Sequence, residues 1–392
     1  MIIELHLIQS FPASNLNRDD LGQPKSVTFG GALRGRVSSQ SLKKAARSLF
    51  PHVGLAEGET AWRTKRLVQQ AAAELEEGDE EQRVAVVTEA LRQMGFGVES
   101  TGLTEYLLFV GRRAVDDLVA FCRENQDWLL KEDAKRADKI AKAKTDQAKK
   151  KLKKEEKPPK KAAQAAKRIL DARRAVDIAL FGRMIADNKD FNVDAASQVA
   201  HAISTHAVAG EFDFYTAVDD LKPDDEAGAD MIGTVDFNAA CYYRYANLDL
   251  GQLQHNLFGK AAKPEDIDED LLQRATSAWL NAFVRAVPSG KQNSMAARTM
   301  PDTLLAVVRD SGSWNLANAF LDPVPGKGVM GASTELMWKH FQQLRGFYGE
   351  EEIRAVAMAS LSGDLEKLEV PESEQAASLQ AFTSKVLGEA RG

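Results

Sequence analysis

The order of strand-like and helix-like periods along the chain constrains its fold more than any other feature. Residues 1–9 alternate apolar with polar side chains, and from Val235 to Tyr245 every second residue is apolar or aromatic, so both segments predict β-strands. The other periodic segments are two amphipathic helices, at 40–50 and 265–287, and two strands, at 200–208 and 303–308. The sequence of elements is strand, helix, strand, strand, helix, strand, which is the βαββαβ order of the ferredoxin-like fold. We therefore predict an α+β protein.

Two insertions interrupt this order. Residues 60–186, between the first helix and the second strand, are almost entirely helical in pattern. Residues 210–233 are polar and rich in turn residues, and they carry an aromatic cluster at Phe212–Tyr215, where a hairpin should join the second and third strands. Elsewhere we expect a loop at 10–28, and only helices and loops over 323–392.

The charge of the chain is strongly segregated. Residues 131–174 contain 18 basic and 7 acidic side chains, a local charge of +11, whereas the chain as a whole carries −6. A milder basic stretch runs from Arg18 to Arg47. The acidic total does not exclude a polyanionic partner, because the local field decides such binding. Since residues 131–174 lack the apolar periodicity of a packed helix, we expect their charge to be exposed, on a solvated helix or a disordered segment.

Several classes of protein are disfavoured by composition. Cys122 and Cys241 lie far apart without a neighbouring cysteine or histidine motif, which argues against a disulfide framework or a zinc site. The apolar runs are far shorter than the ~20 residues that span a bilayer, and no signal peptide pattern is present. We therefore expect a cytoplasmic protein without a metal ion or other cofactor.

The candidate catalytic motifs are weak. Asp19 and Asp20 could bind a metal ion in a nuclease, or could simply structure a loop beside Arg18. The spacing of His201 and His206 is not a zinc pattern. The segment Ser289–Lys291 lacks the upstream glycine of a phosphate-binding Walker loop, and no serine or cysteine nucleophile has an evident base.

Nucleic-acid binding fits the pattern better. The loop and capped helix from Arg18 to Arg47 offer cationic side chains and the free backbone N–H groups of a helix start, and both suit phosphates. The aromatic cluster at Phe212–Tyr215 predicts either a small core of its own or a surface on which bases stack.

Several motifs in fixed order resemble a known family. They are LNRDD (16–20), FGGALRGRVSSQSLKKAARS (29–48), AVDIALFGRM (175–184), AHAISTHAV (200–208), FDFYTAVDDL (212–221) and YRYANLDLGQLQ (243–254). From residue 1 to about residue 320 the chain closely resembles the CasC family, the guide-RNA-binding backbone subunit of the type I-E CRISPR Cascade complex. The resemblance implies a ferredoxin/RRM-like palm at 1–58 and 197–392, a helical fingers insertion at 59–196, and a β-hairpin thumb at about 208–240.

The resemblance also implies site residues. Phosphate contacts carry over onto Arg18, Lys25, Ser38, Gln40, Lys43 and Arg47, and further RNA contacts onto Phe214, Lys291 and Gln292. Met184 and Tyr215 match the positions that wedge beside displaced bases. The lysine-rich segment takes the place of the fingers lysines that engage duplex target DNA, so that Lys149, Lys150, Lys151, Lys153 and Lys154 are the predicted DNA contacts.

The implied role is binding without catalysis. The partners would be CRISPR guide RNA, target DNA, further copies of this chain in a filament, and the large, small, 5′-handle and 3′-hairpin subunits of Cascade. In related type III backbone subunits a loop aspartate cleaves target RNA, so a metal-dependent endoribonuclease using Asp20 is the alternative.

Overall fold

The computed structural model describes residues 1–142, 158–171, 173, 175–185, 191–217, 231–363 and 365–390. Its residue contacts divide the chain into two compact units. The first, here called the sheet unit, comprises residues 1–54, 197–251 and 269–392, and the second, the helical unit, comprises 55–196 and 252–268.

The sheet unit is built on one large, antiparallel sheet. Its strands are β1 (Ile2–Ser14), β2 (Ser26–Phe29), β3 (Ala32–Val37), β6 (Ser197–Val199), β7 (Ala202–Ser204), β8 (Glu211–Ala217), β9 (Met231–Asp249), β10 (Thr303–Arg309) and β11 (Ile353–Ser360). Its helices are α1 (Ser39–Leu49), η1 (Phe50–His52), α10 (Glu269–Arg285), α11 (Gln292–Met295), η5 (Leu316–Phe320), α12 (Val329–Tyr348), η6 (Glu372–Glu374) and α13 (Leu379–Glu389). The strand order is β11-β10-β1-β9-β7-β3-β2, so the first predicted strand lies between the fourth and the third, with the second beyond the third. The predicted α+β fold is confirmed.

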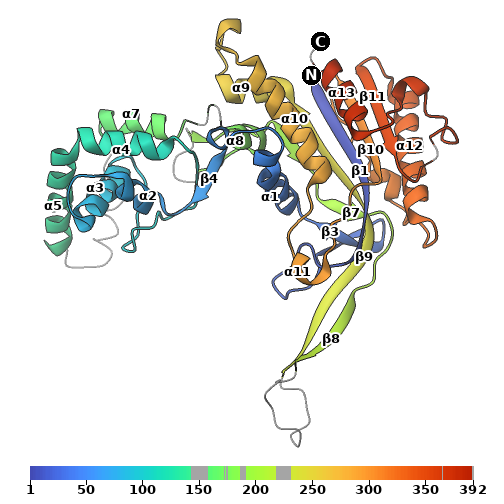
Figure 1. Ribbon diagram of the computed structural model, residues 1–392, viewed down its shortest axis with the longest axis horizontal. Coiled ribbons are helices and arrows are strands. Elements are labelled where there is room, and N and C mark those ends of the chain that lie inside the picture. Colours follow the sequence, from blue (N-terminus) through green and yellow to red (C-terminus); the bar gives the residue numbers. More distant parts are fainter. Residues whose placement is uncertain are drawn as a thin grey trace, which may run out of the picture. The chain divides into compact units, whose positions relative to one another are not determined.

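Helices cover both faces of the sheet. In β1, alternate side chains point to opposite faces. Leu5 and Leu7 lie with Leu42 of α1 and Phe283 of α10, and Ile8, one residue further on, belongs to the hydrophobic cluster that η5 and α12 complete on the other face. Figure 1 shows α10 and α12 on either side of β1. The strand is therefore buried on both faces, although its alternation resembles a strand with one wet face.

The strand boundaries differ from the prediction in three places. The predicted strand at 200–208 is two short strands, β6 and β7, which both pair with β9. The predicted loop at 10–28 is strand at both ends, because β1 continues to Ser14 and β2 begins at Ser26. The C-terminal segment 323–392 contains the unpredicted strand β11, which pairs with β10 along its length. In each case the deciding interaction is with a strand distant in sequence.

A tight turn joins β2 to β3. Gly30 and Gly31 have φ angles of 58° and 74°, the left-handed region that glycine adopts without strain. A Cβ atom on Gly30 would lie 1.6 Å from the carbonyl oxygen of Leu321, so only glycine fits there. The turn is thereby pressed against the end of η5.

The second insertion forms a two-stranded ribbon. β8 pairs with the first part of β9, from Glu211 opposite Phe237 to Ala217 opposite Met231. Figure 1 shows this ribbon continuing β9 beyond the rest of the sheet. It projects from the sheet unit where the sequence predicted a hairpin.

The helical unit has its own hydrophobic core. Its elements are η2 (Glu57–Glu59), β4 (Ala61–Thr64), α2 (Leu67–Glu74), α3 (Glu80–Gln93), β5 (Leu108–Gly111), α4 (Ala114–Glu124), α5 (Gln126–Lys142), α7 (Lys160–Ile169), α8 (Val176–Phe181), η4 (Pro264–Asp266) and most of α9 (Leu250–Phe258). Buried side chains of α2, α3, α4, α5 and α7 form one cluster. Among the helices described, none combines the length and the apolar composition of a membrane-spanning segment.

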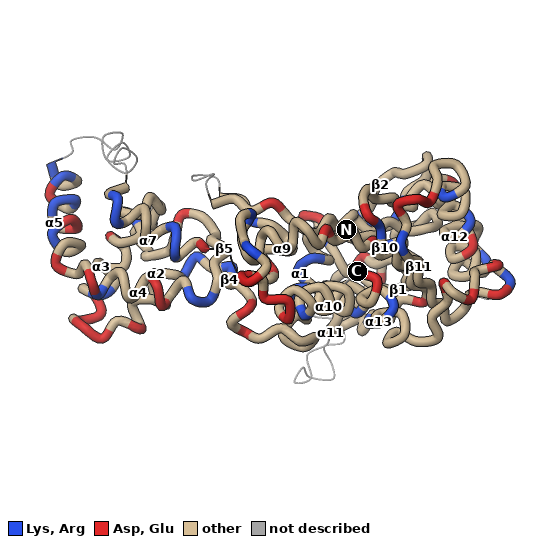
Figure 2. Tube along the Cα trace, turned by 90° about the horizontal axis from the view of Figure 1, so that it is seen from above, with Lys and Arg blue, Asp and Glu red and all other residues tan. Residues whose placement is uncertain are grey.

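The basic segment is more firmly packed than its sequence suggested. At its start, α5 is held to α3 by Arg136, whose Nε donates to the fully buried Glu89 carboxylate at 2.8 Å. At its end, α7 buries an alanine stripe that includes Ala162, Ala165 and Ala166. The expectation that residues 131–174 pack nowhere is therefore wrong for α7, because alanines at helical spacing suffice for close helix packing. Lysines and arginines still lie along α5 and α7 (Figure 2).

Candidate nucleic-acid interface

The face of the sheet that RNA-binding sheets of the RRM type offer to bases is closed in this protein. RRM domains stack bases on aromatic side chains of the sheet. Here the aromatic residues on that face, Tyr243 and Tyr245, are buried beneath η5 and α12 together with His6. A bound single strand must therefore contact the sheet unit elsewhere.

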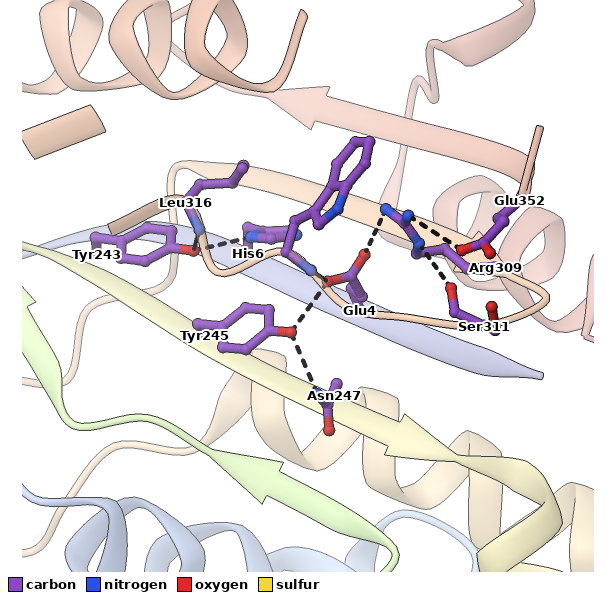
Figure 3. Close-up of polar contacts among 10 residues, drawn as sticks. Glu4, His6, Tyr243, Tyr245, Asn247, Arg309, Ser311, Leu316 and Glu352 are labelled. Carbon is purple, nitrogen blue, oxygen red and sulfur yellow. Dashed lines mark hydrogen bonds and ion pairs between the residues drawn. The ribbon is translucent and has the colours of Figure 1, made fainter. Parts of the chain in front are cut away.

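A polar network fills the closed face instead (Figure 3). The Glu4 carboxylate accepts hydrogen bonds from the Tyr245 hydroxyl at 3.0 Å and from the Trp314 backbone N–H, and lies 3.6 Å from Arg309. The Tyr243 hydroxyl lies 2.9 Å from His6 Nδ1. Burial raises the pKa of Glu4 to about 7 and lowers the pKa of His6 to about 3. These groups satisfy one another within the fold and leave no face for a ligand.

The predicted phosphate contacts converge on the loops that precede β2 and α1. Asn17 organises them, because its side-chain Oδ1 accepts from the Ser38 N–H at 2.8 Å and its backbone oxygen accepts from the Lys25 N–H at 2.9 Å. Lys25 in turn accepts from the Arg36 N–H at 2.8 Å. The loop that carries Arg18 is thereby tied to the start of α1. We call the surface formed by Arg18, Lys25, Gln40, Lys43, Arg47 and Lys291 the basic loop site.

Lys291 joins this site through a close backbone contact. A Cβ atom on the preceding Gly290 would lie 2.4 Å from the Leu16 oxygen and 2.6 Å from the Asn15 oxygen, so the loop presses directly on the end of β1. Lys291 is half-buried and has a left-handed φ of 51°. Gln292 differs from the prediction, because its side chain is buried and its amide donates to Pro288 and Ala297 carbonyls within the loop. Its side chain shapes the loop that carries Lys291.

Helix α1 presents its charged side chains but not all of its N-terminal donors. Lys43 and Arg47 lie four residues apart on one side of the helix, while Leu42 and Ala46 are buried. The N-cap residue Ser38 is buried and accepts from the Ser41 N–H at 3.3 Å. The Ser39 N–H donates to a histidine ring, His201 Nδ1, also at 3.3 Å. The expectation of free N–H groups at this helix start is therefore wrong for these two, because side chains of the fold already satisfy them.

The basic stretch of the sequence contains one arginine that is not at the surface. Arg34 is fully buried and donates to the backbone oxygens of Ser204, Thr205, Phe320 and Leu321 at 2.9–3.2 Å. It fastens β3 to β7 and to η5. Its charge holds the sheet unit together, so Arg34 does not belong to the basic loop site.

The ribbon carries exposed aromatic side chains on both faces. Phe214 pairs across with Thr234 and Tyr215 with Gly233, and neighbouring residues of a strand point to opposite faces. Phe214 is 59% exposed. Tyr215 is 42% exposed, and its ring lies over Gly233, where a Cβ atom would come within 2.5 Å of it. The two predicted base contacts therefore cannot act on the same side of the ribbon.

Met184 belongs to the helical unit and is 86% exposed just after α8. Beside it, the buried Arg183 donates to the backbone oxygens of Phe109, Leu170 and Phe191, and burial lowers its pKa to about 10. This arginine fixes the backbone that displays Met184. The predicted DNA contacts Lys149, Lys150, Lys151, Lys153 and Lys154 lie outside the described residues.

The loop carboxylates have separate roles. Asp19 accepts from the backbone N–H groups of Leu21 and Gln23, both at 2.9 Å, and so structures its turn. Asp20 is exposed beside it. Across the part of the chain that the structure describes, no group of three or more histidine, cysteine or acidic residues is arranged to hold a metal ion.

Comparison with known proteins identifies the family. A family model described as CT1975-like protein matches residues 3–385. The chain belongs to this family. Among solved structures, it is 31% identical to a chain described as "CRISPR RNA-guided surveillance complex, pre-nicking", with a TM-score of 0.82 and full coverage of both chains. It is 26% identical to a chain described as "CRISPR RNA-guided surveillance complex", with a TM-score of 0.72 and 99% of each chain covered. No curated protein matches this chain.

The family resemblance expected from the sequence motifs is thereby confirmed. The matches also extend over the C-terminal segment 323–392, for which the motifs gave no signal. This segment contributes α12, β11 and α13, so the covered sheet face is part of the shared fold.

Proposed function

We propose that this chain is a backbone subunit of a CRISPR RNA-guided surveillance complex, in which it holds the guide RNA by its phosphates. The observation that carries the proposal is the full-length likeness to chains of such complexes. The convergence of Arg18, Lys25 and Lys43 at one set of loops supports it, because sequence segments far apart supply cations to one surface.

The chemistry of the basic loop site suits this role. Lysine and arginine contacts to phosphates fix the position of a strand without reading its sequence. In guide-directed complexes the sequence is read by base pairing with the guide, and the protein supplies the frame. We therefore propose that Lys43 and Arg47, one turn apart on α1, contact the guide backbone, with Arg18, Lys25 and Lys291 around them.

The finer features of the family role are also part of the proposal. Several copies would stack along a guide RNA of a type I-E complex, with the β8–β9 ribbon acting as the thumb and Tyr215 and Met184 placed beside displaced bases. A single aromatic–base stack contributes ~1–3 kcal/mol. The helical unit would act as the fingers and support target DNA binding and R-loop formation in antiviral defence, next to the other Cascade subunits.

The test is retention of guide RNA. Lys43→Ala combined with Arg47→Ala should leave the fold intact, because the buried positions of α1 are Leu42 and Ala46. Complexes purified through a tagged copy would be washed with salt, and their RNA would be quantified and sequenced. The matched control replaces two exposed lysines near and within α12, Lys327 and Lys339. Guide RNA at wild-type levels in the α1 variant would contradict the assignment.

A second candidate function is a metal-dependent endoribonuclease that uses Asp20. The observation in its favour is that Asp19 structures the turn and leaves Asp20 as an exposed carboxylate within the basic loop site. We propose the non-catalytic role, in which Asp20→Ala changes assembly or RNA binding but no hydrolysis. Guide-matched RNA cut by the wild-type complex with Mg²⁺, and left intact with EDTA, would favour the nuclease instead.

A further inference from the structure

A third basic side chain and a histidine meet beside the basic loop site. The His201 ring, between β6 and β7, receives two hydrogen bonds at the same atom. The Arg36 guanidinium and the Ser39 backbone N–H both lie 3.3 Å from His201 Nδ1. Arg36 is also bonded through its backbone N–H to the Lys25 oxygen. These residues come from three segments that are far apart in sequence.

The hydrogen bonds fix the protonation state of the ring. Arginine and a backbone N–H are donors only, so Nδ1 must be an acceptor and the imidazole must be neutral, with its proton on Nε2. The pKa of His201 is lowered by partial burial and by the charges of Arg36 and Lys25. The groups that face the ring are thus Arg36 from β3, Lys25 from the preceding loop and the N-terminal turn of α1. All of them are positive or donate hydrogen bonds.

We propose that Arg36 and His201, together with Lys25, form a phosphate-binding subsite in which binding of an RNA phosphate is coupled to protonation of His201. The inference rests on the proposed function, because it extends the basic loop site by two residues. A phosphate between Arg36 and Lys25 would neutralise the charges that keep the ring neutral. The ring would then take up a proton and add a charged donor to the same phosphate.

The coupling has a defined direction. A phosphodiester stays ionised across the range in which histidine titrates, so the proton taken up belongs to His201. If binding raises the pKa of the histidine, then protonation must strengthen binding to the same extent. Affinity for RNA should therefore rise as the pH falls, by about tenfold for each unit by which the pKa of His201 rises on binding.

The experiment uses the full chain and a fluorescein-labelled oligouridylate, with anisotropy read between about pH 5 and pH 8. His201→Asn places an amide oxygen that can accept from Arg36 and Ser39 but cannot titrate in this range. We expect it to flatten the pH profile while affinity at high pH is retained. Arg36→Ala should lower the slope of log K against log salt concentration by about 0.7, the value for one phosphate contact on a single strand. His255→Ala, an exposed histidine of α9, is the matched control.

A direct readout removes any dependence on folding of the variants. Histidine ring signals of the wild-type protein, followed by NMR during a pH titration, should show the pKa of His201 rising when the oligouridylate is added. An unchanged titration of His201, or a wild-type pH profile in His201→Asn, would overturn the inference. If either occurred while Lys43→Ala with Arg47→Ala still weakened binding, the proposed function would stand. Absence of binding by the wild-type chain at every pH would overturn both.

Discussion

Gly290→Ala is the sharpest test of how the fold builds the basic loop site. The new Cβ atom would lie 2.4 Å from the Leu16 oxygen and 2.6 Å from the Asn15 oxygen. An ordinary contact between carbon and oxygen is about 1 Å longer, and both oxygens belong to backbone that is itself fixed. Asn15 is held by its Nδ2 donating to the Gly22 and Asp236 oxygens at 2.9 and 2.8 Å. The loop carrying Lys291 must therefore move away from β1.

The cost can be estimated from overpacking in well-packed sites, which is typically about 1–3 kcal/mol. We expect a loss of that size in the stability of the sheet unit, followed by thermal unfolding, together with weaker binding of labelled RNA because Lys291 is displaced. Gly326→Ala is the matched control, since a Cβ atom there meets no other atom within 4 Å. Wild-type stability and RNA affinity in Gly290→Ala would refute the reasoning that this contact positions the loop.

Three further predictions address other parts of the molecule. Because Phe214 and Tyr215 lie on opposite faces of the ribbon, Tyr215→Ala should loosen nuclease protection of the guide RNA at regular intervals, while Phe214→Ala should leave that pattern intact; equal patterns in both variants would contradict this. The native state holds a proton on Glu4 up to about pH 7 but resists one on His6 down to about pH 3, so stability should fall as the pH rises from 4.5 to about 7 and as it falls from 6.5 to about 3. Denaturant midpoints across pH would show this optimum, and Glu4→Gln should abolish the loss on the alkaline side only. Alanine in place of the basic cluster should weaken duplex DNA binding with a salt slope lower by about 0.9 per lost phosphate contact, and should leave guide RNA content unchanged; equal salt lines for variant and wild type would show that the cluster only faces solvent. The cluster comprises Lys149, Lys150, Lys151, Lys153 and Lys154.

Local pattern predicted the elements whose periodicity is complete within one segment. The period-two aromatic run of β9 and the Ser38 cap of α1 were both evident before any tertiary contact was known. The opposite faces of Phe214 and Tyr215 could also have been deduced, because adjacent residues in a strand always point apart. The basic character of the stretch from Arg18 to Arg47 was evident as well, and the motifs identified the family.

Tertiary structure decided what each pattern meant. Glu4 and His6 read as the wet face of an edge-like strand, but they are buried because η5 and α12, near the other end of the chain, cover that face. Arg34 counted as surface charge until the fold closed four backbone oxygens around it. Composition gives the number of cations, but only contacts between distant segments determine which of them face solvent.

The same reason explains the residues that sequence reasoning passed over. His201 was dismissed as a metal ligand on spacing alone, and Arg36 was one arginine among several. Their meeting at the start of α1 depends on β7 pairing with β3 and β9, an arrangement that no local period encodes. Sequence determined the elements and the chemistry available to this protein, whereas the packing of distant strands determined which side chains act together, because each element's pattern records its own burial but not the identity of its neighbour.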